Sequence, residues 1–178
     1  AVPGGPNGSR RPPRGRPGPA AYSNPMTRVV DFVILGQGLA GTALAWRLRS
    51  RGCSVLVIDR EAGGASRVAA GLVTSVTGKR LAKSWRWDEL FPAAAMFYRG
   101  MEAETGQPFF AERPALRLLA TDAERAEFGR RAGDALAGLV RKNPAVNPGW
   151  FAAPHGGFEL TAARLDVPRY LGASREHF

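Results

Sequence analysis

The most constraining feature of this sequence is a glycine-rich turn that links an apolar run to a helical pattern. Val29 to Leu35 is rich in β-branched and aromatic residues without alternation. Such a run predicts a strand that is covered on both faces in a parallel sheet. Gly36, Gly38 and Gly41 follow with the spacing G-x-G-x-x-G. With a strand before it and a helix after it, this turn indicates a dinucleotide-binding site.

Each glycine has its own predicted role. Gly36 permits a sharp exit from the strand, Gly38 leaves room for a pyrophosphate against the backbone, and Gly41 lets the helix pack closely on the strand. The N–H groups of the first helical residues, Leu39 and Ala40, are expected to point toward the phosphates at the positive end of the helix dipole.

A second strand and an acid complete the pattern. The helix is predicted over residues 39–51 and stops at Gly52, and Ser54 to Ile58 reads as a second buried strand that ends in Asp59. A carboxylate at this point accepts hydrogen bonds from an adenosine ribose. Arg60 suggests a clamp for the 2′-phosphate of NADP, but Asp59 would repel that phosphate. We therefore predict an unphosphorylated adenosine ribose, as in FAD or NAD.

The segment of residues 61–80 combines small residues with hydroxyl and basic side chains. Small residues allow a large ligand to come close. Ser66 is expected to cap a short helix over residues 67–72, whose N–H groups would point toward phosphate or ribityl oxygens. Taken alone, the segment fits a small-residue helix packed on the sheet equally well.

Residues 31–80 resemble the N-terminal part of FAD-dependent oxidoreductases of the D-amino-acid oxidase type, a family that includes glycine oxidase and D-amino-acid dehydrogenase. The resemblance rests on the glycine turn, on Asp59 and on the run Ser66-Arg-Val-Ala-Ala-Gly71. It implies that the isoalloxazine ring of FAD lies near four residues, Ser66, Arg67, Ala70 and Gly71. Asp59 departs from the family, which more often has glutamate there, although the shorter acid still reaches a ribose.

The resemblance also implies a reaction, the oxidation of the C–N bond of an amine or amino-acid substrate. A hydride leaves the substrate carbon for the flavin, the imine hydrolyses, and oxygen or another electron acceptor reoxidises the flavin. Two other classes stay open. An NAD(P)-dependent dehydrogenase shares every feature up to Asp59, and a non-enzymatic nucleic-acid-binding protein would depend on the basic N-terminus.

Whether the net charge of +10 indicates a nucleic-acid partner depends on where the basic residues lie in the sequence. Residues 1–25 hold four arginines and no acid within a Pro- and Gly-rich stretch, which predicts disorder. Met26 directly before the fold looks like a start, so we interpret the stretch as a leader and expect no nucleic-acid partner. No apolar run is long enough to span a membrane, and the single cysteine, Cys53, excludes an internal disulfide. A cytoplasmic protein is expected.

Together with the strand and helix signals, the resemblance implies an α/β protein: a Rossmann-like parallel FAD-binding sheet, then the start of a mainly antiparallel substrate-binding sheet. The expected division is an FAD-binding part over residues 26–108, a partial substrate-binding part over 109–165, and a helix over 166–178 that returns to the FAD-binding part. Because family members are longer, residues 27–178 are expected to match their N-terminal half. We expect this chain alone to be inactive, with exposed sheet edges and apolar faces.

Local signals predict the later elements. A helix is expected from Asp88 to Thr105, and two short strands broken at Pro114 follow it. Thr121-Asp-Ala-Glu124 is a capping box that starts a charged, solvated helix toward Arg131 or Leu139. Further signals predict a loop over 143–149, a strand from Gly156, and a last helix from Val167 with Asp166 as its cap.

Neither Cys53 nor His155 is expected to be catalytic. Cys53 stands just before the second strand, where a small buried residue is expected. His155 stands in a loop with no acid or cysteine close to it in the sequence. The sequence leaves the substrate, the electron acceptor, the catalytic residues and the oligomeric state open.

Overall fold

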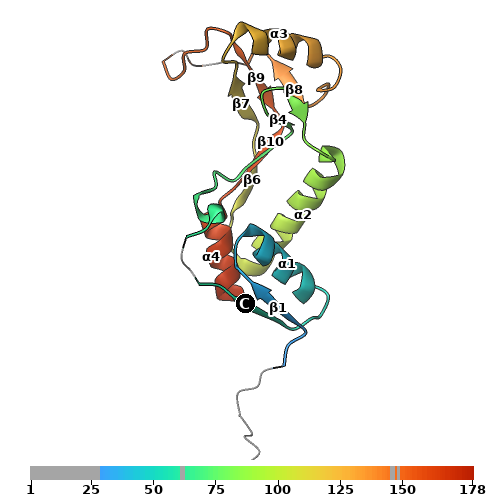
Figure 1. Cartoon of the computed structure of the whole chain (residues 1–178), viewed down its shortest axis with the longest axis vertical. Helices are drawn as coiled ribbons and strands as arrows, with labels where there is room; N and C mark the ends of the chain where they lie inside the picture. The colour runs from blue at the N-terminus through green and yellow to red at the C-terminus, as the bar shows by residue number, and fades with distance from the viewer. Residues whose placement is uncertain (1–28, 61–62, 145–146, 148) are drawn as a thin grey trace, which may run out of the picture.

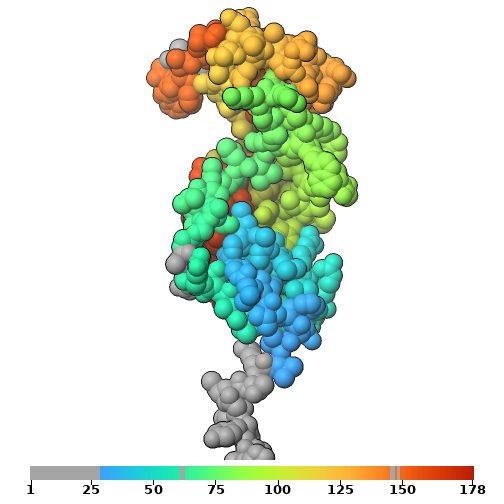
Figure 2. All heavy atoms as spheres, in the orientation of Figure 1, coloured from blue at the N-terminus to red at the C-terminus, as the bar shows by residue number. Residues whose placement is uncertain are grey.

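The computed structural model describes residues 29–60, 63–144, 147 and 149–178. The predicted leader, residues 1–25, and Met26 lie outside these residues. The chain forms an elongated mixed α/β structure, with β1, α1 and α4 at one end and α3, β7, β8 and β9 at the other (Figure 1). Helix α2, drawn in green, lies along the region between the two ends (Figure 2).

The strands of the described residues belong to four sheets. Their bounds are β1 Phe32–Leu35, β2 Val55–Ile58, β3 Leu72–Thr74, β4 Val76–Thr77, β5 Ala82–Lys83, β6 Phe110–Glu112, β7 Ala115–Leu118, β8 Val140–Lys142, β9 Gly157–Leu160 and β10 Ala162–Leu165. The sheet orders are β1-β2, β3-β10-β6, β4-β5 and β7-β9-β8. The first sheet is parallel and every other pairing is antiparallel.

The predicted strand, helix and strand around the glycine turn are confirmed. Helix α1 spans Leu39–Arg49 and so ends two residues before the predicted last residue, Arg51. Asp31 joins the starts of the two strands, because its Oδ2 accepts the N–H of Ser54 at 2.8 Å and the hydroxyl of Ser54 at 2.6 Å. These hydrogen bonds lower the pKa of Asp31. Cys53 is half-buried rather than buried.

The prediction that the first strands are covered on both faces is wrong for the residues described. Helix α1 covers the face that carries the buried Ile34. On the opposite face, the exposed fractions are 55% for Val33, 80% for Leu35, 38% for Leu56 and 50% for Ile58. The register places these four side chains together, since Val33 pairs with Leu56 and Leu35 with Ile58. The apolar side chains of this face are therefore in contact with solvent, which agrees with the expectation of exposed apolar faces.

The predicted short helix over residues 67–72 is also wrong. A single 3-10 turn, η1, spans Ala65–Val68. Gly64 precedes it at φ 105° and Ala69 follows in an extended conformation, so the backbone leaves the turn and enters β3. The hydroxyl of Ser66 does not cap this turn; it accepts the N–H of Leu39 in α1 at 3.1 Å.

Two pairs of consecutive strands, β6–β7 and β9–β10, connect the sheet β3-β10-β6 with the sheet β7-β9-β8. The predicted break at Pro114 is confirmed, because β6 ends at Glu112 and β7 begins at Ala115. Strands β9 and β10 are separated by Thr161 alone. Because β6 pairs with β10 and β7 pairs with β9, the two connections between these sheets lie opposite each other. Strands β3, β4, β5, β8 and β10 were not predicted, since two to four residues show a period only weakly.

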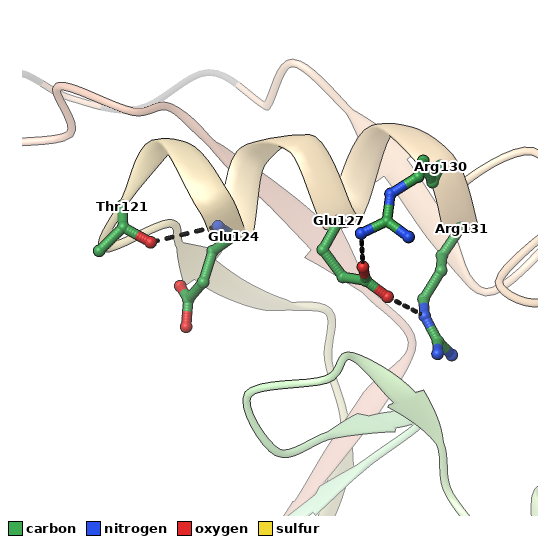
Figure 3. A network of polar contacts seen from close by, with 5 residues as sticks. All are labelled: Thr121, Glu124, Glu127, Arg130 and Arg131. Carbon is green, nitrogen blue, oxygen red and sulfur yellow. Dashed lines mark hydrogen bonds and ion pairs between the residues drawn. The ribbon is translucent and has the colours of Figure 1, made fainter.

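The helices follow the predicted signals closely. Helix α2 spans Trp87–Thr105 and ends at Gly106, which has φ 68°. Helix α3 spans Asp122–Arg131, so it does not continue to Leu139. The capping box is confirmed, with the hydroxyl of Thr121 accepting the N–H of Glu124 at 3.2 Å (Figure 3).

The charged side chains of α3 form ion pairs along the helix, as Figure 3 shows. Glu127 lies between Arg130 and Arg131 and pairs with both. The hydrogen bond from Arg131 is the main cause that lowers the pKa of Glu127. Arg130 is 73% exposed, in agreement with a solvated face.

Helix α4, Val167–His177, brings the end of the chain back to α1. The predicted cap is confirmed, because Asp166 Oδ1 accepts the N–H of Arg169 at 3.1 Å. The indole N–H of Trp46 donates to the hydroxyl of Ser174 at 2.8 Å, and both side chains are buried. Around this contact lies an apolar core built from α1, α2, α4 and β10, whereas a second core lies beneath α3.

Candidate cofactor-binding site

A cavity of about 250 Å³ lies where β1 and β2 end. Its walls come from the glycine turn, the residues after β2, the 3-10 turn η1 and helix α4. Six residues predicted from the sequence line it: Gly36, Gly38, Asp59, Arg60, Ser66 and Arg67. A volume below that of complete small-molecule sites fits one portion of a dinucleotide.

The glycines of the turn differ in what surrounds them. Gly36 has φ 96°, a backbone conformation that favours glycine. A Cβ at Gly41 would lie 2.0 Å from the carbonyl oxygen of Gly36, so helix α1 approaches the strand as closely as only glycine permits. A Cβ at Gly38 would lie 3.0 Å from the hydroxyl oxygen of Ser66. Gly36 and Gly41 therefore have clear structural roles in the turn, while Gly38 faces the cavity and the 3-10 turn.

The acid at the end of β2 is tied to the glycine turn. Asp59 Oδ2 accepts the N–H of Gln37 at 2.7 Å, and the N–H of Gly36 donates to the carbonyl of Ile58 at 2.8 Å. The other carboxylate oxygen of Asp59 lies 3.9 Å from Nη2 of Arg175. The carboxylate is thereby held at the edge of the cavity between the turn and helix α4.

Sequence reasoning missed Gln37, Gly63, Gly64 and Leu171 of the cavity lining, and also Arg175, which lies beside Asp59. Nε of Arg175 donates to the side-chain oxygen of Gln37 at 2.9 Å, across 138 positions of sequence. No local motif marks Arg175. The only signal is its place in a helix that was expected to return to the FAD-binding part of the chain.

The other predicted site residues lie beside the cavity or away from it. Leu39, Ala40 and Gly41 form the first turn of α1, next to the cavity. Gly71 packs against β10 instead: a Cβ there would lie 1.9 Å from the carbonyl oxygen of Leu165. Ala70 is exposed and, like Gly71, does not line this cavity.

The charge around the cavity suits a phosphate group. The backbone N–H groups of Gln37 and Leu39 donate to the carboxylate of Asp59 and the hydroxyl of Ser66. Two arginines, Arg60 and Arg67, belong to the lining. A diphosphate would thus meet positive charge as well as the N-terminus of α1.

Outside this cavity, His155 lies against an acidic side chain. Nδ1 of His155 lies 2.9 Å from Oδ1 of Asp122, a partner 33 positions away that sequence proximity did not reveal. Within the described ranges, no group of three or more His, Cys, Asp or Glu side chains is arranged to hold a metal ion. Across the same residues, none of the helices has both the length and the apolar content needed to cross a bilayer.

The model of the family described as FAD dependent oxidoreductase matches residues 31–178, which include the glycine turn, the cavity and the antiparallel sheets. The chain belongs to this family. The resemblance drawn from the sequence is confirmed, and with it the cofactor of the family, FAD, in preference to NAD(P).

Several solved structures share the fold at low sequence identity. The chain is similar to glycine oxidase from Bacillus cereus ATCC 14579, with a TM-score of 0.62, 17% identity, and coverage of 83% of this chain and 44% of the other. It is similar to L-amino acid deaminase from Proteus vulgaris, with a TM-score of 0.57, 18% identity, and coverage of 83% and 37%. Iminodiacetate oxidase from Chelativorans sp. BNC1 gives a TM-score of 0.53, 22% identity, and coverage of 82% and 43%.

The chain therefore spans less than half the length of the solved structures that it matches. At these identities the likeness establishes the fold. None of the curated proteins matches the chain.

Proposed function

We propose that the β1-α1-β2 unit is a Rossmann-like FAD-binding unit and that the cavity at its end holds the adenosine diphosphate portion of FAD. One observation carries the proposal: the glycine turn between two parallel strands opens into a cavity that Asp59 borders. The family match supports the identity of the cofactor.

Different residues of the cavity would bind different parts of the adenosine diphosphate. Gly38 and the first turn of α1 would face the pyrophosphate, because Gly38 has no Cβ and the N-terminus of α1 is the positive end of the helix dipole. Asp59 would accept hydrogen bonds from the ribose hydroxyls. Arg60 and Arg67 would supply positive charge to the phosphates.

The proposed reaction is oxidation of the C–N bond of an amino acid or amine. When bound, FAD supplies the capacity to take a hydride from the carbon of that bond. The names of three structural relatives, a glycine oxidase, an L-amino acid deaminase and an iminodiacetate oxidase, support this substrate class. The contribution of residues 29–178 is to hold the adenosine end of the cofactor in a fixed orientation, and their antiparallel sheets would form part of the substrate-binding region.

The site is tested by the substitution Gly38→Val. Two methyl groups would enter the space between the turn and Ser66, where a Cβ alone already comes within 3.0 Å of the hydroxyl. We expect this variant to lose FAD binding, measured by the quenching of flavin fluorescence on titration with the protein. ADP should compete with FAD for the same site.

Gly100→Val is the matched control. It makes the same substitution in a helix, at a position with nothing within 4 Å of a Cβ. Gly100→Val is expected to keep FAD affinity, and circular dichroism would establish that both variants are folded. Stoichiometric FAD in folded Gly38→Val would show that the glycine turn is only structural.

The reaction is tested separately with the FAD-loaded protein under anaerobic conditions. Amino acids and amines are added one at a time, and loss of the oxidised flavin's visible absorbance identifies those that reduce it. Reduction by NADH alone, with no response to any amine, would contradict the proposed substrate class while leaving the FAD site intact.

A further inference from the structure

A second cavity, of about 320 Å³, is bordered by strand β6, strand β10 and the beginning of helix α4. Three arginines line it, Arg113, Arg164 and Arg169, together with a single acid, Asp166. Its lining shares no residue with the cavity at the glycine turn. Positive charge is in excess here, and neither the proposed cofactor site nor the proposed reaction accounts for it.

The acid and one of the arginines are already committed to each other and to the backbone. Asp166 caps helix α4 through the N–H of Arg169, and its Oδ2 lies 3.9 Å from Nε of Arg169. Arg169 also donates from Nη1 to the carbonyl of Pro108 at 3.0 Å. The negative charge of Asp166 is thus directed at its own helix, and Arg169 is held at the rim of the cavity.

Arg113 and Arg164 lie on one face of the sheet. Arg164 is paired with Ala111 in the register, and the N–H of Arg113 donates to the carbonyl of Ala162 at 3.1 Å. Because side chains alternate along a strand, residues 111, 113, 162 and 164 share a face, and Arg113 is the diagonal neighbour of Arg164 at a Cα distance of about 7–8 Å. The spacing lets two long guanidinium side chains reach one small ligand.

These two arginines have no carboxylate to balance them. Both are exposed, and among the residues that the structure places neither side chain forms an ion pair. The neighbouring acid on β6, Glu112, points to the opposite face and pairs with Arg99 of α2. Like charges on adjacent strands destabilise a sheet, and a bound anion would remove that repulsion.

We propose that Arg113 and Arg164, with Arg169 at the rim, form a binding site for a small dianion, a phosphoryl group or a dicarboxylate. Guanidinium groups suit both ligands, because their planar N–H donors match two oxygens of a phosphate or a carboxylate. The excess of positive charge in the cavity favours a doubly charged ligand over a single carboxylate.

The test is titration calorimetry with inorganic phosphate of the full chain and of its Gly38→Val variant, in which the cavity at the glycine turn is blocked. We expect one phosphate per chain, with affinity that falls as the KCl concentration rises, because salt screens exposed charges. Arg164→Gln and Arg113→Gln should each raise the dissociation constant by about tenfold or more, since each removes a charge-assisted hydrogen bond.

Arg130→Gln is the matched control, since it removes an arginine of similar exposure on α3, remote from the cavity. It is expected to leave the affinity unchanged. Succinate used in place of phosphate distinguishes a dicarboxylate ligand from a phosphoryl ligand. The probe that binds with the lower dissociation constant identifies the chemical class of the natural ligand. The absence of binding by both probes, or equal affinity in Arg164→Gln and the unchanged chain, would overturn the proposal. If the unchanged chain does not bind ADP but still binds phosphate through the arginines, the proposed cofactor site is refuted and the arginine site is not.

Discussion

Gly41→Ala offers the sharpest test of how the glycine turn is built. An alanine Cβ at this position would lie 2.0 Å from the carbonyl oxygen of Gly36 and 3.3 Å from Cγ2 of Ile34. Relief of the first contact requires the helix and the turn to separate by about 1 Å, because Cβ atoms do not approach other heavy atoms within 3.0 Å. The carbonyl has little freedom to move, since the N–H of Gly36 is bonded to Ile58.

Two opposing contributions determine the magnitude. Overpacking of a close contact costs about 1–3 kcal/mol, and a backbone contact belongs at the upper end of that range. Alanine in a helix gains at most about 1 kcal/mol over glycine. We therefore expect Gly41→Ala to lower the free energy of unfolding by about 2 kcal/mol, and the melting temperature by about 4–8 °C for a chain of this size.

Urea denaturation followed by circular dichroism measures this loss, with Gly100→Ala as the control. Gly100 lies inside α2 with nothing within 4 Å of a Cβ, so its replacement gains helix propensity without a clash. Gly100→Ala should raise the free energy of unfolding by about 0.5–1 kcal/mol. A Gly41→Ala variant as stable as the unchanged chain would show that the close approach of α1 to the turn does not require glycine.

Two further predictions concern contacts far from the glycine turn. Ser174→Ala removes the acceptor that the described residues provide for the buried indole N–H of Trp46, so we expect urea denaturation to show a free energy of unfolding lower by about 1–3 kcal/mol. The double variant with Trp46→Phe should then lose less stability than the sum of the two single variants. Full additivity would contradict the hydrogen bond. Glu127 has a pKa below its ordinary value of 4.5, chiefly because Arg131 donates to it, so its ion pairs stabilise the fold above that pH and are lost as the pH falls through the lowered pKa. Glu127→Gln should therefore destabilise the chain at neutral pH and have no effect once Glu127 is protonated; a deficit that is equal at neutral and acidic pH would show that the charge has no part in it.

Much of the candidate site could be predicted because its signals are local. A glycine with a positive φ, an apolar strand before it and an acid at the end of the next strand are all encoded within residues 29–60, and the structure brings Gly36, Gly38 and Asp59 together as this pattern requires. The helix caps could also be predicted from the sequence, since Thr121 and Asp166 each accept a hydrogen bond from an N–H group only three residues away.

The segment after β2 was predicted less well, because its conformation depends on distant partners. The hydroxyl of Ser66 was expected to cap its own helix, yet it accepts the N–H of Leu39, 27 positions earlier. Gly71 was expected beside the flavin, but a Cβ there would meet β10, which lies more than 90 residues downstream. The role of Ser66, Arg67, Ala70 and Gly71 toward the isoalloxazine ring stays a prediction.

The sequence by itself determined the elements whose hydrogen bonds and apolar periods are local: the parallel pair with its glycine turn, the capped helices and the break at Pro114. Only the tertiary structure decided which of these elements meet. It placed Arg175 against Gln37 and Asp59, and it put Arg113 beside Arg164 on one sheet face. The physical reason is that such contacts follow from the register of strands and the packing of helices, which depend on the whole chain, whereas a cap or a turn depends on a few neighbouring residues.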